Sequence, residues 1–157
     1  VAVRAAREKD EQPGQRAFHR QHRRSINRCM DPATDYDANR EPRGWREVDE
    51  QRRVRAVTEF HDRRRGAHPP MPKVRLHATM HVVVENQLAA GDPPEARATL
   101  ERLIGEGLSR HEAVHALMNA VSQQMVELLG EGRTFDRTRF AELLAALDAD
   151  AYRGSAP

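Results

Sequence analysis

The chain has 157 residues, of which 38% are hydrophobic and 32% are charged, so we expect one domain with a modest core. No apolar run approaches the roughly 20 residues that span a bilayer, and the N-terminal stretch lacks the apolar segment of a signal peptide. Cys29 is the only cysteine, which excludes an intramolecular disulfide and a cysteine-based zinc site. These features favour a cytoplasmic protein with no membrane partner.

The charges divide the chain into a basic and an acidic part. Residues 1–73 carry 18 Lys and Arg against 12 Asp and Glu, whereas residues 74–157 carry 8 against 12. Residues 1–44 show no sustained apolar period, which predicts a largely irregular arm. The arm contains a basic patch made of Arg16, Arg20, Arg23, Arg24 and Arg28. Such a patch suits a polyanion such as nucleic acid, or a protein partner. A solvated arm is the simpler explanation, because aromatic residues that stack on bases are nearly absent.

A first helix is predicted from Trp45 to Arg65. Its apolar residues recur at spacings close to three and four, namely Trp45, Val48, Val54, Val57 and Phe60. Gly66 and the proline-rich residues 67–72 end it. His61 lies one turn beyond Val57, and we interpret it as a histidine at the edge of the core.

A second helix is predicted from Pro72 to Ala90, with Gly91 as its C-terminal stop. Leu76, Met80, Val84 and Leu88 form one apolar arc of this helix. His77 projects within that arc, His81 lies just past it, and Glu85 lies at its border. Imidazoles that point partly inward need partners for their nitrogens.

Start signals predict the remaining helices. Asp92 is expected to cap a short helix that ends near Gly105, and Ser109 and Glu112 form a capping box for a helix that runs to Gly130. Asp136 is expected to cap a last helix. Apolar arcs accompany these signals, with Val114, Leu117, Met118, Val121, Met125 and Leu129 on the longest helix.

The expected fold class is therefore all-α, because no strand pattern occurs. We predict a compact bundle of about four principal helices in residues 45–150. The basic arm of residues 1–44 precedes it, and a frayed tail of residues 151–157 follows it.

Two histidine pairs dominate the candidate chemistry. His77 and His81 form one pair, and His111 and His115 form the other, each at a spacing of four residues. A helix places such residues on one side, one turn apart, where both can bind one metal ion. We expect the two helices to be parallel neighbours, with both pairs at a similar height. Metal centres of helical bundles are built from such facing helices.

The predicted metal ligands are His77, His81, His111 and His115, with Glu85 as a further ligand or as a hydrogen-bond partner of one imidazole. Four imidazoles, or three with a carboxylate, suit Zn²⁺ first and also Fe²⁺, Ni²⁺ or Cu²⁺. The alternative is a structural or interaction module whose histidines bond one another, with the basic arm contacting a partner.

The His-Glu-x-x-His pattern of residues 111–115 also occurs in zinc peptidases, where the glutamate activates water. Glu112 would be the catalytic base in that case. Its place in a capping box and the lack of a predicted sheet for an extended substrate favour a protein that is not an enzyme.

Both motifs together resemble a bacterial family of small helical domains of uncharacterised function. The resemblance rests on His77-x3-His81-x2-Val-Glu85-Asn86-Gln87, followed by Arg110-His111-Glu112-Ala-x-His115-Ala, and it covers about residues 54–147. It implies an all-α fold and marks the same histidines, but it implies no activity.

Overall fold

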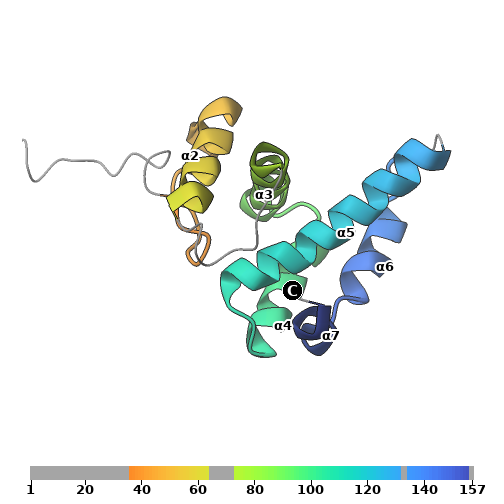
Figure 1. The fold of residues 1–157 in the computed structure, drawn as a ribbon. Helices are drawn as coiled ribbons and strands as arrows, with labels where there is room; N and C mark the ends of the chain where they lie inside the picture. Colours follow the sequence, from red (N-terminus) through yellow and green to blue (C-terminus); the bar gives the residue numbers. More distant parts are fainter. Residues whose placement is uncertain (1–35, 64–72, 132–133, 156–157) are drawn as a thin grey trace, which may run out of the picture. The chain divides into compact units, whose positions relative to one another are not determined.

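The computed structural model describes residues 36–63, 73–131 and 134–155 (Figure 1). All of them belong to one compact unit that spans residues 32–157. The basic patch at residues 16–28 and the proline-rich residues 67–72 lie outside the described residues, so the expectations for them stay predictions.

Helices make up all the regular structure of the described residues, as the sequence predicts. A short 3-10 turn, η1 (Trp45–Glu47), is followed by α2 (Glu50–Arg63), α3 (Val74–Ala90), α4 (Pro94–Gly105), α5 (Arg110–Glu131), α6 (Arg137–Ala145) and α7 (Ala149–Ser155). The all-α fold class is confirmed, and the four longest helices are α2 to α5. Across these ranges, no helix has the length and apolarity to cross a bilayer.

Helix α3 occupies the centre of the fold, packed against α2 on one side and α5 on another (Figure 1). Its residues Ala78 and Val82 join an apolar cluster with α2, whereas Met80 and Val84 join the main core with α5. A helix covered on two sides has to be apolar around much of its circumference. Leu76, which was expected in the apolar arc, is exposed because the buried sides of α3 point elsewhere.

The two helices that carry the histidine pairs, α3 and α5, are adjacent but not parallel. Figure 1 shows α3 nearly end-on while α5 runs across the view, so the two helices cross. The expectation of parallel neighbours is therefore wrong. At a crossing, only a short part of each helix meets the other, and here that part carries the histidines.

The main core lies among α3, α4, α5 and α6. Its fully buried members include Leu103 of α4, Leu117 of α5, and Phe140 and Leu144 of α6. A smaller cluster lies on the other side of α3 and contains Trp45, Val57 and Phe60. Tyr36 and Ala38, which belong to the expected arm, are also buried in this smaller cluster.

Two helix starts differ from the sequence expectation. The helix predicted from Trp45 is interrupted at Val48, whose backbone is extended, and Asp49 accepts a 3.0 Å hydrogen bond from the Arg52 amide to start α2. Helix α4 begins at Pro94 after Pro93 rather than after an Asp92 cap. The Asp92 carboxylate instead pairs with Arg137 at the start of α6.

Other helix ends agree with the expectation. Gly91 ends α3 in a left-handed conformation with φ of 65°, which a glycine adopts without strain. Asp136 accepts a hydrogen bond from the Arg139 amide at the start of α6. The tail expected at residues 151–157 differs, because helix α7 continues to Ser155. This helix begins with a 2.8 Å hydrogen bond from the Ala151 amide to the Asp148 carboxylate.

The C-terminal half of α5 extends beyond the main core. Met125 and Leu129, which the sequence placed in its buried arc, are 43% and 84% exposed. The apolar period continues past the point where α3 and α4 stop covering the helix, so periodicity alone overestimates the buried length.

A matched pair of α5 substitutions tests this division. Leu117→Ala should lower the free energy of unfolding by about 2–5 kcal/mol, because it leaves a cavity in a fully packed position. Leu129→Ala should change it by less than about 0.5 kcal/mol, because the side chain is already in water. Urea unfolding followed by circular dichroism measures both. Equal losses in the two variants would contradict the burial described for α5.

Candidate metal centre

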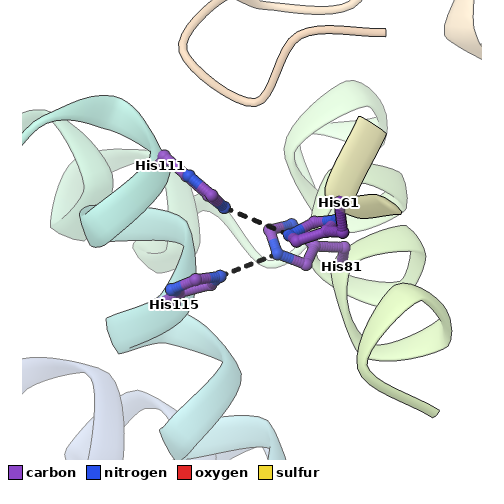
Figure 2. A group of neighbouring side chains, drawn as sticks. All are labelled: His61, His81, His111 and His115. Carbon is purple, nitrogen blue, oxygen red and sulfur yellow. Dashed lines mark hydrogen bonds between the residues drawn. The ribbon is translucent and has the colours of Figure 1, made fainter. Parts of the chain in front are cut away.

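Five histidines from three helices converge at the crossing of α3 and α5. His61 comes from the last turn of α2, His77 and His81 from the first half of α3, and His111 and His115 from the first two turns of α5. One nitrogen from each of His61, His81, His111 and His115 lies within 4.8 Å of all the others. Figure 2 shows these four rings pointing toward one another across the gap between the helices.

The Nε2 atoms form the centre of the group. His81 Nε2 lies 2.9 Å from His115 Nε2, and His111 Nε2 lies 3.3 Å from His61 Nε2 (Figure 2). His77 Nε2 lies 3.1 Å from the Nε2 atoms of both His61 and His81. His77 is therefore a fifth neighbour, although the group of four in mutual reach does not include it.

Sequence reasoning found most of this site but missed one member. His81, His111 and His115 come together as predicted from the two motifs, and His77 adjoins them. His61 was interpreted as a histidine at the edge of the core, yet it is fully buried within the group. Its position one turn after the buried Val57 was the available signal, because it places a polar ring on the apolar side of α2.

Hydrogen bonds on the far side of two rings fix which nitrogen faces the centre. His61 Nδ1 lies 2.8 Å from the Val57 carbonyl oxygen, which only accepts, so Nδ1 carries the proton and donates it. A neutral His61 then presents the lone pair of Nε2 to the group.

His81 is held in the same way by Tyr36. The Tyr36 hydroxyl donates to Glu85 Oε1 at 3.1 Å, and its oxygen lies 3.4 Å from His81 Nδ1. Because the hydroxyl proton is used on Glu85, its oxygen accepts from a protonated Nδ1 of His81. Burial, followed by the Glu85 carboxylate, raises the pKa of Tyr36 well above its usual value, so the phenol keeps that proton.

His81 itself is an uncharged imidazole near neutral pH. Burial is the largest cause that lowers the pKa of His81 well below its usual value, and His115 is the next. Protonating a fully buried ring beside four other imidazoles is unfavourable. A neutral ring is also the form that binds a metal.

Glu85 does not lie in the group of four, and its carboxylate is bound elsewhere. Arg110 donates to Glu85 Oε1 at 2.8 Å and to Oε2 at 2.7 Å, in a bidentate pair between α3 and α5. The Glu85 side chain is 1% exposed and that of Arg110 is 11% exposed. The Tyr36 hydroxyl lies between the Glu85 carboxylate and His81. The sequence instead expected Glu85 to be a ligand or a direct hydrogen-bond partner of an imidazole.

Arg110 also connects the site to the segment before η1. It donates a 2.9 Å hydrogen bond to the Ala38 carbonyl oxygen. Tyr36 of the same segment bonds Glu85, the partner of Arg110. Tyr152 of α7 adds a further contact, since its hydroxyl lies 3.4 Å from His115 Nδ1. Elements distant in sequence therefore border the same group of imidazoles.

Glu112 has a structural contact at the start of α5. Its Oε2 accepts a 2.8 Å hydrogen bond from the Ser109 amide, and its own amide donates to Ser109 Oγ at 3.3 Å. This reciprocal pair is the predicted capping box. The hydrogen bonds from Ser109 also lower the pKa of Glu112. The carboxylate is exposed and lies outside the group of four nitrogens in mutual reach.

Comparison with known proteins gives one match. A family model described as a domain of unknown function, DUF1841, matches residues 45–146. Searches of curated proteins and of solved structures found no match. The matched residues contain all five histidines, Glu85 and Arg110, whereas Tyr36 and Ala38 precede them.

Removal of Arg110 tests the buried ion pair. Arg110→Ala should lower the free energy of unfolding by about 3–5 kcal/mol, because it leaves the buried Glu85 carboxylate without its cation. Arg97, whose pair with Glu41 is largely exposed, provides the matched control. Arg97→Ala should cost no more than about 1 kcal/mol. Chemical denaturation measures both, and a loss for Arg110→Ala as small as the control's would contradict the role given to the pair.

Substitution of Glu112 separates capping from catalysis. Glu112→Ala should cost about 0.5–1 kcal/mol of stability through the lost cap. Glu112→Gln should be nearly neutral, since an amide can still accept the bond from Ser109. Thermal unfolding measures the two changes. A hydrolytic activity that Glu112→Gln abolished without loss of stability would instead identify the carboxylate as a catalytic base.

Proposed function

Since this chain belongs to the DUF1841 family of domains of unknown function, we propose a function from its site: it binds one divalent transition-metal ion. The proposed ligands are the Nε2 atoms of His61, His81, His111 and His115. A bacterial origin of the family, and its use of both histidine pairs, stay expectations from the resemblance. A cytoplasmic location is likewise a prediction from the sequence.

The spacing of the Nε2 atoms is the observation that carries this proposal. With metal–nitrogen bonds of about 2.0–2.1 Å, neighbouring ligand nitrogens lie about 2.9 Å apart at right angles and about 3.3 Å apart in a tetrahedron. Among the four proposed ligands, His81 Nε2 and His115 Nε2 are 2.9 Å apart, and His111 Nε2 and His61 Nε2 are 3.3 Å apart. All four side chains offer a nitrogen within 4.8 Å of the others. The two short spacings match ligands of one shared ion, and the 4.8 Å limit leaves the other pairs to close by small ring movements when an ion binds.

The outer hydrogen bonds support the same proposal. A metal-bound histidine usually donates its other ring N–H to a carbonyl or carboxylate, which fixes the ring and raises its basicity. Val57 accepts from His61, and Tyr36, backed by Glu85, accepts from His81. Both rings are therefore oriented with a lone pair toward the proposed ion.

A cluster of hydrogen-bonded imidazoles is the competing explanation. His111 could donate Nε2–H to His61, and His115 could donate to His81, at the distances observed. That scheme requires only that His111 lie near His61 and that His115 lie near His81. It gives no reason for four nitrogens from three helices to lie within 4.8 Å of one another. A metal ion accounts for the mutual closeness.

The ligand type restricts the metal. Imidazole nitrogens suit Zn²⁺, Cu²⁺, Ni²⁺ and Fe²⁺, whereas Mg²⁺ and Ca²⁺ prefer oxygen ligands. The group of four contains no carboxylate and no thiolate. We propose Zn²⁺ first, because four neutral imidazoles match its tetrahedral preference.

A zinc hydrolase is less well supported than a binding domain. His111 and His115 both reach the group, as a His-Glu-x-x-His zinc site requires. However, the Glu112 carboxylate is bonded to the Ser109 amide and lies outside the group of four nitrogens in mutual reach. The proposal is therefore metal binding without an assigned reaction.

The direct test is the metal content of protein purified without a His tag. Element analysis should give about one transition-metal ion per chain after zinc addition and desalting. His81→Ala should lose most of it, because this ring lies at the centre of the group. His77→Ala should keep measurable metal, since His77 is outside the four nitrogens in mutual reach.

Thermal unfolding with and without a chelator provides the second readout. The chelator should lower the melting temperature of the metal-loaded parent, because metal bound only to the folded state stabilises it. It should leave the melting temperature of His81→Ala unchanged. Less than about 0.2 metal per chain together with chelator-independent melting would show that the histidines are structural.

A further inference from the structure

We infer that the metal-loaded site also binds a small monovalent anion, as an external ligand of the ion. This inference rests on the proposed metal function and adds a ligand class to it. It follows from the charges of the residues around the histidines rather than from the histidines alone.

The proposed ligands supply no negative charge to the ion. All four are imidazoles, which bind metals as neutral rings. In the part of the chain that the structure describes, the one buried carboxylate is that of Glu85. Arg110 holds both of its oxygens, so this carboxylate is already compensated by a cation.

A divalent ion in this setting therefore keeps its full charge among buried groups. His61 and His81 are 1% and 0% exposed, so water screens their side of the ion poorly. An uncompensated charge in such surroundings is strongly unfavourable, and an anion directly on the metal removes part of it.

Helix ends add to the positive potential. His77 and His111 lie in the first turns of α3 and α5, where the helix dipole is positive. His61 lies in the last turn of α2, where the dipole is negative. Two positive ends against one negative end favour an anion in the site further.

Among the described residues, the histidines of the group differ in how far they are buried. His111 and His115 of α5, and the adjoining His77, are only half-buried, in contrast to His61 and His81. Zinc in catalytic sites, where three protein ligands and one external ligand are bound, can expand to five-coordinate. We extend this expansion to an ion held by four imidazoles. An anion that reached the ion would therefore approach past the half-buried rings rather than past His61 and His81.

The experiment uses the full chain loaded with Co²⁺, whose visible absorption reports its ligands, and azide as the anion. Azide should produce a saturable change in the cobalt spectrum. Perchlorate at equal ionic strength, which coordinates metals weakly, should produce none. Isothermal titration calorimetry of azide with the zinc-loaded protein gives an independent readout without cobalt.

A matched pair of variants tests the charge argument itself. His111→Glu provides an anionic ligand from the protein, so its azide affinity should fall by about tenfold relative to His111→Gln, which has the same length and no charge. Cobalt content is measured first in each variant. If either variant fails to bind cobalt, the azide titration of the parent protein decides.

The outcomes distinguish the two proposals. If the parent protein shows no cobalt bands and takes up no zinc, the metal function fails and the anion inference falls with it. If cobalt binds but azide changes neither its spectrum nor the calorimetric heat, the anion inference alone is wrong. Equal azide affinity in the two His111 variants would overturn the charge argument.

Discussion

The buried ion pair between Glu85 and Arg110 is the constraint on which the arrangement of this protein depends. It joins the two crossing helices α3 and α5 by two charge-assisted hydrogen bonds in a bidentate geometry. Glu85 lies one turn after His81, and Arg110 directly precedes His111. The pair therefore sets the height and the rotation at which the histidines of the two helices meet. Tyr36 and Ala38 attach to the same pair, so the segment before η1 is held by it as well.

The histidine group lies between two apolar clusters, and this position carries a cost in stability. Burying imidazoles without partners is unfavourable, and each buried ring here needs a partner for both of its nitrogens. Val57 and Tyr36 provide partners on the outer side of His61 and His81. On the inner side the ring nitrogens face one another. A bound metal ion would give all of them a partner, whereas hydrogen bonds between the rings would pair them only two at a time. A site built in this way couples ligand binding to the packing of α2, α3 and α5.

The family match contains most of the site but not all of it. All five histidines and the ion pair lie inside the matched residues 45–146, but Tyr36 lies before them. Its phenol is buried and connects Glu85 to His81. The segment before the matched domain is therefore part of the surroundings of the site, rather than only an arm that precedes it.

The sequence by itself determined the all-α fold, the end of α3 at Gly91, the caps of α5 and α6, and the two histidine pairs, because these depend on spacings within one helix. It did not determine that α2 ends beside α3, so His61 looked like a histidine at the edge of the core. It placed Glu85 among the candidate ligands, because its cation Arg110 is distant in the chain. It also placed α3 and α5 parallel, although periodicity contains no information on the angle between helices. Only tertiary structure decided these points, because packing between helices fixes which rings share one centre and which carboxylate is already neutralised.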